Sequence, residues 1–332
     1  MENRILLKSS IMPYVIFSGI FGVCPVKIKN GDVSFSKIKF THGFLLTLLF
    51  LTYIGYHYSN QDYNRYSYNS AISQFSLMAY PILFLIIFPG FLMNSKKFSK
   101  LLNNCFDYTE IIPSKKFYSR FFWIISSEII LFGILLLYHY LRLFFARFEV
   151  VHDVAASIRP FLGFFIANSI NSIILWMCNL LIFLKEVFVV LNNDLMKIQP
   201  CSIIFLKWKS KTLYGDRQLE RWGFSEAENE IDVVTWILAY NHVVETCLNL
   251  NKCFNLSAMG TTILVMVELI TSLFELIALP KNMWIVGPWI AFVVLQLFFL
   301  IFSCELVSEE VSISHFEKPS RNSSFKDKTG QL

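Results

Sequence analysis

The chain has 332 residues, of which 55% are hydrophobic and 16% are charged, and its formal net charge is +5 at pH 7. With a mean hydropathy of +0.52, it has too little polar surface to enclose its apolar side chains in a soluble fold. The basic residues occur in short blocks between apolar runs, so we expect no nucleic acid partner. The composition therefore excludes a soluble enzyme and indicates an integral membrane protein with the lipid bilayer as its solvent.

The first apolar segment, residues 11–23, is too short to span a bilayer and lacks the cleavage pattern of a secretory signal. It contains Pro13 and two glycines and is followed by Cys24-Pro25. We interpret it as a retained segment that either lies on the membrane surface or enters the membrane and turns back.

Six longer apolar runs follow, each near the length of about 20 residues that a helix needs to cross a bilayer. The second run contains Pro81 and Pro89, which remove backbone hydrogen bonds and are expected to bend the helix. The predicted fold class is all-α, a polytopic membrane helical bundle with six transmembrane helices. They are predicted at about residues 41–59, 71–93, 121–145, 160–184, 256–279 and 284–304.

Lysine and arginine are distributed unevenly among the segments between these runs. One side of the membrane would receive the basic residues of the N-terminal segment, of the loop after the second run, of the long loop at about 185–255 and of the tail. By the positive-inside rule this side is the cytoplasm, so both termini are predicted to be cytoplasmic. The other side would hold only Arg65, Arg147, Arg159 and Lys281, with Arg142 at a helix end.

The second half of the long inner loop, 227–251, shows the apolar spacing of a helix. Glu228, Glu230 and Asp232 lie near its start, where the helix dipole favours negative charge. This helix either packs against other subunits or lies on the membrane surface, and the sequence leaves both alternatives open. The acceptor sequons at Asn255 and Asn322 fall on the predicted inner side and are expected to stay unmodified.

Sequence motifs for catalysis are absent: there is no nucleophile elbow, phosphate-binding glycine loop, HExxH pair or cluster with metal-ligand spacing. We therefore expect no enzymatic activity, no cofactor and no metal. The seven cysteines form no CxxC pair and are expected to be reduced and buried. The sequence also lacks a potassium-channel filter and the arginine repeat of a voltage sensor.

Polar and aromatic residues at membrane depth are the remaining candidates, because ionisable groups there are costly and usually face a cavity or a partner. In the outer halves of the predicted helices they form a candidate small-molecule pocket. For aromatic residues near the interface, such as Tyr138, an aromatic belt is the alternative. We interpret Glu128, nearer the inner end, as reaching the interface. The pocket candidates are Tyr80, Tyr138, His139, Phe164, Asn168, Glu268, Glu275, Trp289 and Gln296.

Three stretches resemble the insect chemoreceptor superfamily, and within it gustatory receptors more than odorant receptors. They are PYVIFSGIFGVCP at 13–25, LAYNHVVETCLNLNKCFNLSAMGTTILVMVELITSLFELI at 238–277, and FSCELVSEEVS at 302–312. The resemblance covers about residues 10 to 315. We therefore expect a receptor-like transmembrane domain at 1–315 and a polar cytoplasmic tail at 316–332.

The resemblance implies a ligand-gated cation channel subunit that detects small-molecule tastants at the plasma membrane of chemosensory neurons. It also implies assembly into a homo- or hetero-tetramer with other receptor subunits. Members of the superfamily have a seventh, pore-lining span, whereas the tail of this chain is polar, so we expect that span to be missing. An odorant receptor of the same superfamily is the nearest alternative, and a transporter or a G-protein-coupled receptor comes from a different class.

Overall fold

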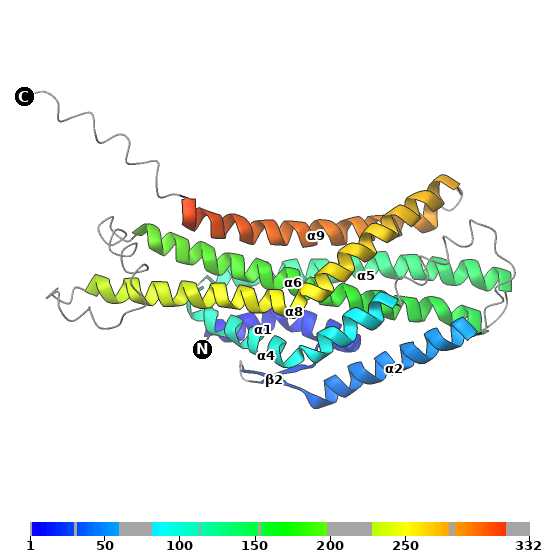
Figure 1. Ribbon diagram of the computed structural model, residues 1–332, viewed down its shortest axis with the longest axis horizontal. Coiled ribbons are helices and arrows are strands. Elements are labelled where there is room, and N and C mark those ends of the chain that lie inside the picture. The colour runs from blue at the N-terminus through cyan, green and yellow to red at the C-terminus, as the bar shows by residue number, and fades with distance from the viewer. Residues whose placement is uncertain are drawn as a thin grey trace, which may run out of the picture.

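The computed structural model describes residues 2–29, 32–59, 82–112, 114–151, 154–197, 228–278 and 283–316. Over these residues the fold is helical apart from one two-stranded hairpin. Long helices lie roughly side by side along the long axis of the molecule and form an elongated bundle (Figure 1). The predicted all-α fold class is confirmed.

The elements follow one another along the chain with short connections where these are described. They are α1 (Glu2–Ile20), β1 (Val26–Lys29), β2 (Asp32–Phe35), α2 (Lys37–Ser59), a helix at Ile82–Met93, α4 (Ser95–Asp107), the 3-10 turn η2 (Tyr108–Glu110), α5 (Lys115–Val151), α6 (Val154–Lys197), α8 (Glu228–Ala278) and α9 (Met283–Phe316). The hairpin is antiparallel, with Val26 opposite Phe35 and Lys29 opposite Asp32.

Among the described residues, four helical segments are long and apolar enough to cross a membrane, one in each of α5, α6, α8 and α9. They coincide with four of the six predicted runs, because a helix that must cross a bilayer needs a long apolar run wherever it occurs. The protein is therefore a multi-pass membrane protein. The segments are Lys115–Phe145, Phe161–Asp194, Trp236–Phe274 and Val286–Val311.

The first two predicted runs are less fully described. Run 41–59 lies within α2, which forms a helix but is not among these four segments. The first part of run 71–93 lies outside the described residues, and its second part forms the helix at Ile82–Met93. That helix and the following segment, Ser95–Glu110, are bent by 61° and together make a fifth candidate span. The number six stays a prediction.

The bend lies at Asn94 and not at Pro89, which sits inside the helix at Ile82–Met93. Asn94 leaves the helical path, with φ −86° and ψ 4°. Its side-chain amide donates to the carbonyl oxygen of Gly90 at 3.1 Å, so it competes with the backbone for that acceptor. The expectation that proline sets the bend is therefore wrong for Pro89, and Pro81 lies outside the described residues.

Helix α1 is longer and more deeply packed than the sequence indicated. It begins at Glu2, and its face containing Leu7, Ile11 and Tyr14 is buried against α5 and α6. The Tyr14 hydroxyl donates to the carbonyl oxygen of Ser172 on α6. One side of the helix is therefore covered by protein along its length, and both interpretations of its position in the membrane stay predictions.

A tight turn after α1 sends the chain back through the hairpin to α2. Gly22 has a φ of +73°, a conformation that glycine adopts without steric cost. Gly43 of α2 lies so close to this turn that a Cβ there would be 2.5 Å from the Gly22 carbonyl oxygen. Two glycines thus set the contact between α2 and the end of α1.

Helix α6 is the centre of the bundle. In its most apolar window 72% of the residues are buried, against 28–39% in the windows of α5, α8 and α9. It contacts α1, α5, α8 and α9. It carries buried polar side chains, among them Asn168, Asn171 and Asn179, which are costly against lipid, and this explains its central position.

The predicted loop helix at 227–251 and the predicted fifth span form one continuous helix, α8. It changes direction near its middle (Figure 1). Its first part packs against its own chain, where Trp236 donates from Nε1 to the carbonyl oxygen of Leu191 at 2.7 Å. Leu238 and Leu248 on this part are 65% and 56% exposed, so one side of it remains open.

Candidate ligand-binding site

Four helices bring predicted candidates together around one buried carboxylate. Glu268 of α8 is 3% exposed, and its Oε2 accepts a hydrogen bond from Nε1 of Trp289 on α9 at 3.0 Å. We call the set Glu268, Trp289, His139, Tyr140 and Phe164 the Glu268 cluster.

The aromatic members of the cluster pack face to face and edge to face. The rings of His139 and Trp289 stack with centroids 4.6 Å apart and planes 28° apart. Tyr140 meets both rings edge-on, at 5.1 Å and 6.2 Å, and Phe164 of α6 lies 5.9 Å from Tyr140. Such geometries are favoured by the ring quadrupoles. The cluster therefore joins α5, α6, α8 and α9 through specific contacts.

A glycine on α6 makes room for Tyr140. A Cβ at Gly163 would lie 2.7 Å from Cε1 of Tyr140, closer than van der Waals contact allows. With glycine at this position, the Tyr140 ring of α5 lies directly on the α6 backbone. This close approach brings α5 and α6 together beside Phe164.

Buried amides continue the polar surface along α6. Asn168 is fully buried and donates from Nδ2 to the carbonyl oxygen of Phe164 at 2.9 Å. Asn171 accepts from Nε2 of Gln296 on α9 at 3.4 Å. Asn168 Oδ1, Asn171 Nδ2 and Gln296 Oε1 are buried and have no hydrogen-bond partner among the described residues. Such atoms favour a polar guest, because an unpaired buried polar group is costly.

Tyr138 lies apart from the cluster. It is 38% exposed, and the Arg142 guanidinium sits 5.5 Å above its ring and donates to its hydroxyl at 3.3 Å. This outward position fits the aromatic-belt alternative. Tyr80 and the side chain of Glu275 lie outside the described residues.

Glu128 is buried and does not reach the membrane interface, so that expectation is wrong. Its side chain on α5 is 2% exposed and accepts from Nδ2 of Asn179 on α6 at 2.8 Å. The sequence position of Glu128 near a helix end suggested exposure. The central helix, however, presents an amide at the same level, and the carboxylate turns toward it.

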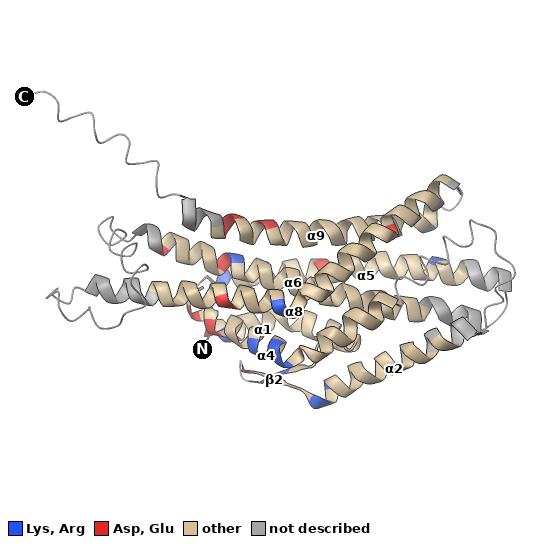
Figure 2. Ribbon diagram, viewed as in Figure 1, with Lys and Arg blue, Asp and Glu red and all other residues tan. Residues whose placement is uncertain are grey.

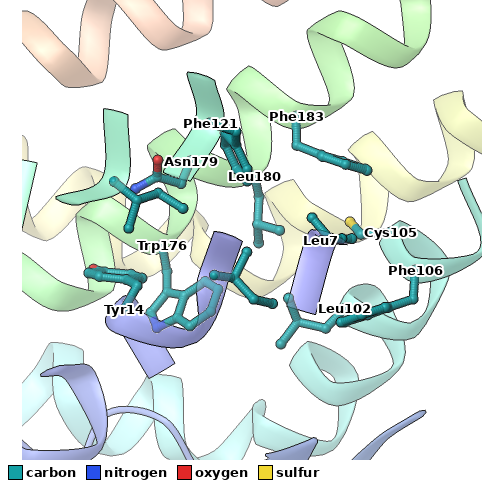
Figure 3. Close-up of a pocket in the computed structure, with 12 residues that line it drawn as sticks. Leu7, Tyr14, Leu102, Cys105, Phe106, Phe121, Trp176, Asn179, Leu180 and Phe183 are labelled. Atoms are coloured by element: carbon teal, nitrogen blue, oxygen red, sulfur yellow. The ribbon is translucent and has the colours of Figure 1, made fainter. Parts of the chain in front are cut away.

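A small cavity lies away from the Glu268 cluster, between α1, α4, α5 and α6 (Figure 3). Most of its lining is apolar or aromatic, including Leu7, Phe183 and Trp176, and Asn179 provides an amide. Its space suits about one water molecule. None of the predicted pocket candidates lines this cavity.

A sequence profile of the 7tm chemosensory receptor family matches residues 11–313, which is most of the chain. The chain belongs to this family. The resemblance to the insect chemoreceptor superfamily is thereby confirmed. None of the curated proteins compared with the chain matches it.

The bundle is similar to the solved structure of the insect olfactory receptor OR5 from Machilis hrabei, with a TM-score of 0.65 and 17% sequence identity. The match covers 94% of this chain and 83% of that one. At this level of identity the similarity shows that the two proteins share a fold. It does not distinguish a gustatory from an odorant receptor.

Of the nine predicted pocket candidates, the structure brings His139, Phe164, Glu268 and Trp289 into one cluster and places Asn168 and Gln296 on the adjoining amides. The sequence prediction missed Tyr140 and Asn171. Asn171 lies three residues after Asn168, so helical spacing alone places it on a neighbouring part of the same face. The sequence contains no comparable signal for Tyr140, because its ring packs on α6 only where Gly163 has no side chain.

Proposed function

We propose that this chemosensory receptor chain is a subunit of a ligand-gated cation channel of the gustatory type, which binds a small-molecule tastant at the Glu268 cluster. It is proposed to have no enzymatic activity. The observation that carries the proposal is the family match over residues 11–313 together with a buried carboxylate ringed by aromatic side chains from several helices. Sites for small molecules are mainly apolar and aromatic, with a few well-placed polar groups.

The position of the cluster suits a receptor. Residues from α5, α6, α8 and α9 meet there, so a ligand that contacts them binds one arrangement of these helices better than another. A ligand shifts a conformational equilibrium by that difference in affinity. We propose that tastant binding changes the packing of these four helices and that the change reaches the other subunits of a tetramer.

The proposed location is the plasma membrane of chemosensory neurons, with both termini in the cytoplasm. Figure 2 supports this orientation, since most of the described lysines and arginines gather in the part of the bundle that holds α1, α4 and the hairpin. With the basic part in the cytoplasm, as the positive-inside rule requires, the Glu268 cluster is proposed to lie in the outer half.

The gustatory assignment rests on the sequence stretches at 238–277 and 302–312. An odorant receptor is the second candidate, and the similarity to an olfactory receptor structure supports it at the level of the fold. Panels of tastants and of volatile odorants, tested on the same cells, separate the two.

The test is expression in oocytes with current recording, using the chain alone, with co-expressed receptor subunits and with a seventh span grafted after residue 315. We expect a tastant-dependent cation current in at least one arrangement. As a readout that needs no conduction, the purified chain is screened for ligands that raise its melting temperature, since a ligand of the native state stabilises it. If surface-delivered protein responds to no tastant in either assay, the proposal is rejected.

A further inference from the structure

The start of α2 lies beside the end of the helix at Ile82–Met93. Two contacts show this arrangement. The rings of Phe50 and Phe84 have centroids 5.0 Å apart, and a Cβ at Gly43 would lie 3.2 Å from Cδ2 of Leu92. Positions later in α2 thus meet positions earlier in the other helix, so the two helices run antiparallel. The lysines that precede α2 and those that follow the other helix are therefore brought to the same end of the pair.

Helix α4 continues from this end and has a basic outer face. Lys96, Lys97 and Lys100 are exposed, and their spacing of three and four residues puts them on one side of the helix. Asn103 lies next to that side and fastens α4 to β2. Its amide donates to the carbonyl oxygen of Val33 at 2.7 Å and accepts from the Val33 backbone nitrogen at 2.8 Å. The basic face of α4 therefore lies beside the hairpin.

The hairpin and the first turn of α2 carry further lysines. Lys27 and Lys29 alternate with the buried Val26 along β1 and are exposed. Lys37 and Lys39 begin α2 directly after the hairpin. Figure 2 shows basic residues at the start of α2 and on α4, around the hairpin. We call the following set the lysine patch: Lys27, Lys29, Lys37, Lys39, Lys96, Lys97 and Lys100.

Carboxylates near the lysine patch are bound by another residue. Asp32 of β2 and Asp107 at the end of α4 both pair with Arg4, at 4.0 Å and 2.7 Å. Within the described ranges, no lysine of the patch forms an ion pair with a carboxylate. Clustered charges of one sign create a potential that attracts ligands of the opposite sign. The patch is therefore suited to an anionic partner.

Exposed apolar side chains among the lysines favour a lipid over a soluble anion. Ile38, between Lys37 and Lys39, and Met93, just before α4, are each 85% exposed. Lysines combined with apolar side chains suit the boundary between lipid headgroups and acyl chains. Clusters of lysines that directly adjoin a membrane-crossing helix are typical of binding sites for anionic lipids, including phosphoinositides. The patch adjoins α2 and the bent candidate span in this way.

We propose that the lysine patch binds the headgroup of a polyphosphorylated phosphatidylinositol at the membrane surface. Its lysines come from the hairpin, α2 and α4, so a headgroup with several phosphates contacts more of them at once than phosphatidylserine does with its single net charge. The bound lipid then holds these three elements together. In the proposed orientation the patch faces the inner leaflet, where anionic lipids occur. The inference does not depend on the proposed receptor function, because it requires only a chain embedded in a bilayer.

Photocrosslinking of the full chain in nanodiscs tests the site. The discs contain phosphatidylcholine and a small, varied fraction of phosphatidylinositol bisphosphate that carries a photoreactive group on its headgroup. Because a nanodisc offers the lipid on both faces, the result does not depend on the orientation of the chain in cells. We expect the crosslinked peptides to come mainly from residues 26–39 and 93–107. Crosslinks that are no more frequent there than in other segments overturn the inference.

Lys96→Gln with Lys100→Gln removes two exposed charges from the patch. The matched control, Lys116→Gln with Arg120→Gln, removes two exposed charges from the start of α5. In the patch variant the lipid fraction that gives half-maximal crosslinking should rise by roughly tenfold or more, since each lysine near an anionic surface contributes about fivefold to binding. The control should change it by less than about twofold on the same basis. Equal rises in the two variants would mean general attraction by positive charge and overturn the site.

Three unlabelled competitors identify the ligand. Phosphatidylinositol bisphosphate should suppress crosslinking of the labelled lipid. Phosphatidylserine at the same total charge, and soluble inositol trisphosphate, should each compete several-fold less well, because the first lacks clustered phosphates and the second lacks acyl chains. Equal competition by phosphatidylserine overturns the assignment to a phosphoinositide. Equal competition by inositol trisphosphate overturns the assignment to a lipid.

Discussion

At the scale of single residues, one indole makes two different contacts in the Glu268 cluster. Trp289 both stacks on His139 and donates to Glu268 Oε2, so it combines a packing contact with a hydrogen bond. A phenyl ring at this position keeps the first and loses the second. Substitution at Trp289 therefore separates the two contributions.

Trp289→Phe is expected to lower the stability of the protein by roughly 1–3 kcal/mol, the usual cost of removing a partner from a buried polar group. The measurement is thermal unfolding of the purified chain in detergent. Trp284→Phe is the control, because Trp284 is 75% exposed, and it should leave the melting temperature unchanged. Equal shifts in both variants would contradict the importance of the hydrogen bond.

Gly163 and Gly133 make a second matched pair. Gly163→Ala places a methyl group 2.7 Å from Tyr140 Cε1 and should destabilise the protein by about 1–3 kcal/mol, as overpacking does. At Gly133 of α5 a Cβ meets nothing within 4 Å, so Gly133→Ala should be neutral or stabilise by up to about 1 kcal/mol through helix propensity. Melting temperatures that shift in the same direction would refute the close contact of Tyr140 with α6.

Prediction of single residues from the sequence succeeded where burying a charged group is costly. It failed where the burial of a side chain depends on a partner from another helix. A carboxylate at mid-span must face protein, which correctly placed Glu268 inside the bundle. The same rule was not applied to Glu128, because its position near a predicted helix end allowed an exposed side chain. The amide of Asn179, which comes from another helix, cannot be located from the sequence around Glu128.

At the scale of elements, a hydrogen-bonded contact fastens the α4–η2 segment to the first part of α8. The Tyr108 hydroxyl lies 2.6 Å from Thr246 Oγ1 and 2.9 Å from His242 Nδ1. Asn104 donates from Nδ2 to Thr246 Oγ1 at 3.1 Å. Tyr108 is buried, so this contact is shielded from water.

Thr246→Val keeps the shape of the side chain and removes the shared hydroxyl. We expect a loss of about 1–3 kcal/mol, since the variant removes the hydrogen bonds of both Tyr108 and Asn104 to this hydroxyl, and faster amide hydrogen exchange in α4 and in α8 near residue 246. Thr262→Val is the control, since Thr262 bonds the carbonyl oxygen of Ala258 in its own helix. Exchange that stays unchanged in α4 after Thr246→Val would show that the contact does not hold the two elements together.

Helix α8 was predicted as two separate helices because its first part is polar and its second apolar. A helix ends where the backbone is interrupted, however, and residues 228–278 contain no proline and a single glycine, Gly260. The helix propensity of the chain therefore stays high across the boundary between the polar and the apolar part. Gly260 instead marks a close approach, because a Cβ there would lie 2.9 Å from Cδ1 of Ile87.

At the scale of the whole molecule, the orientation in the membrane is open to a direct test. We expect an epitope tag at Met1 to be inaccessible to antibody on intact cells and accessible after permeabilisation, as the positive-inside rule requires. A tag inserted within residues 60–70, which are predicted to lie outside, is the control and should be stained on intact cells. Staining of the Met1 tag before permeabilisation would reverse the orientation and remove the proposed outer position of the Glu268 cluster.

Composition predicted the membrane class and four of the spans, because the thickness of the bilayer imposes the same apolar length on every crossing helix. It did not predict that α1 packs inside the bundle. That segment is shorter than a span, and its burial depends on Tyr14 meeting Ser172 and Trp176 on α6. Contacts between helices far apart in the sequence leave no periodic pattern in either helix.

The central position of α6 has a consequence for how such a receptor can change over generations. A substitution on α6 disturbs several partner helices at once, whereas a substitution on the inward side of α5, α8 or α9 alters one wall of the proposed ligand site. New chemical preferences are therefore expected to arise by variation in those three walls. Helix α6 is then expected to keep its packing while the ligand specificity of the receptor changes.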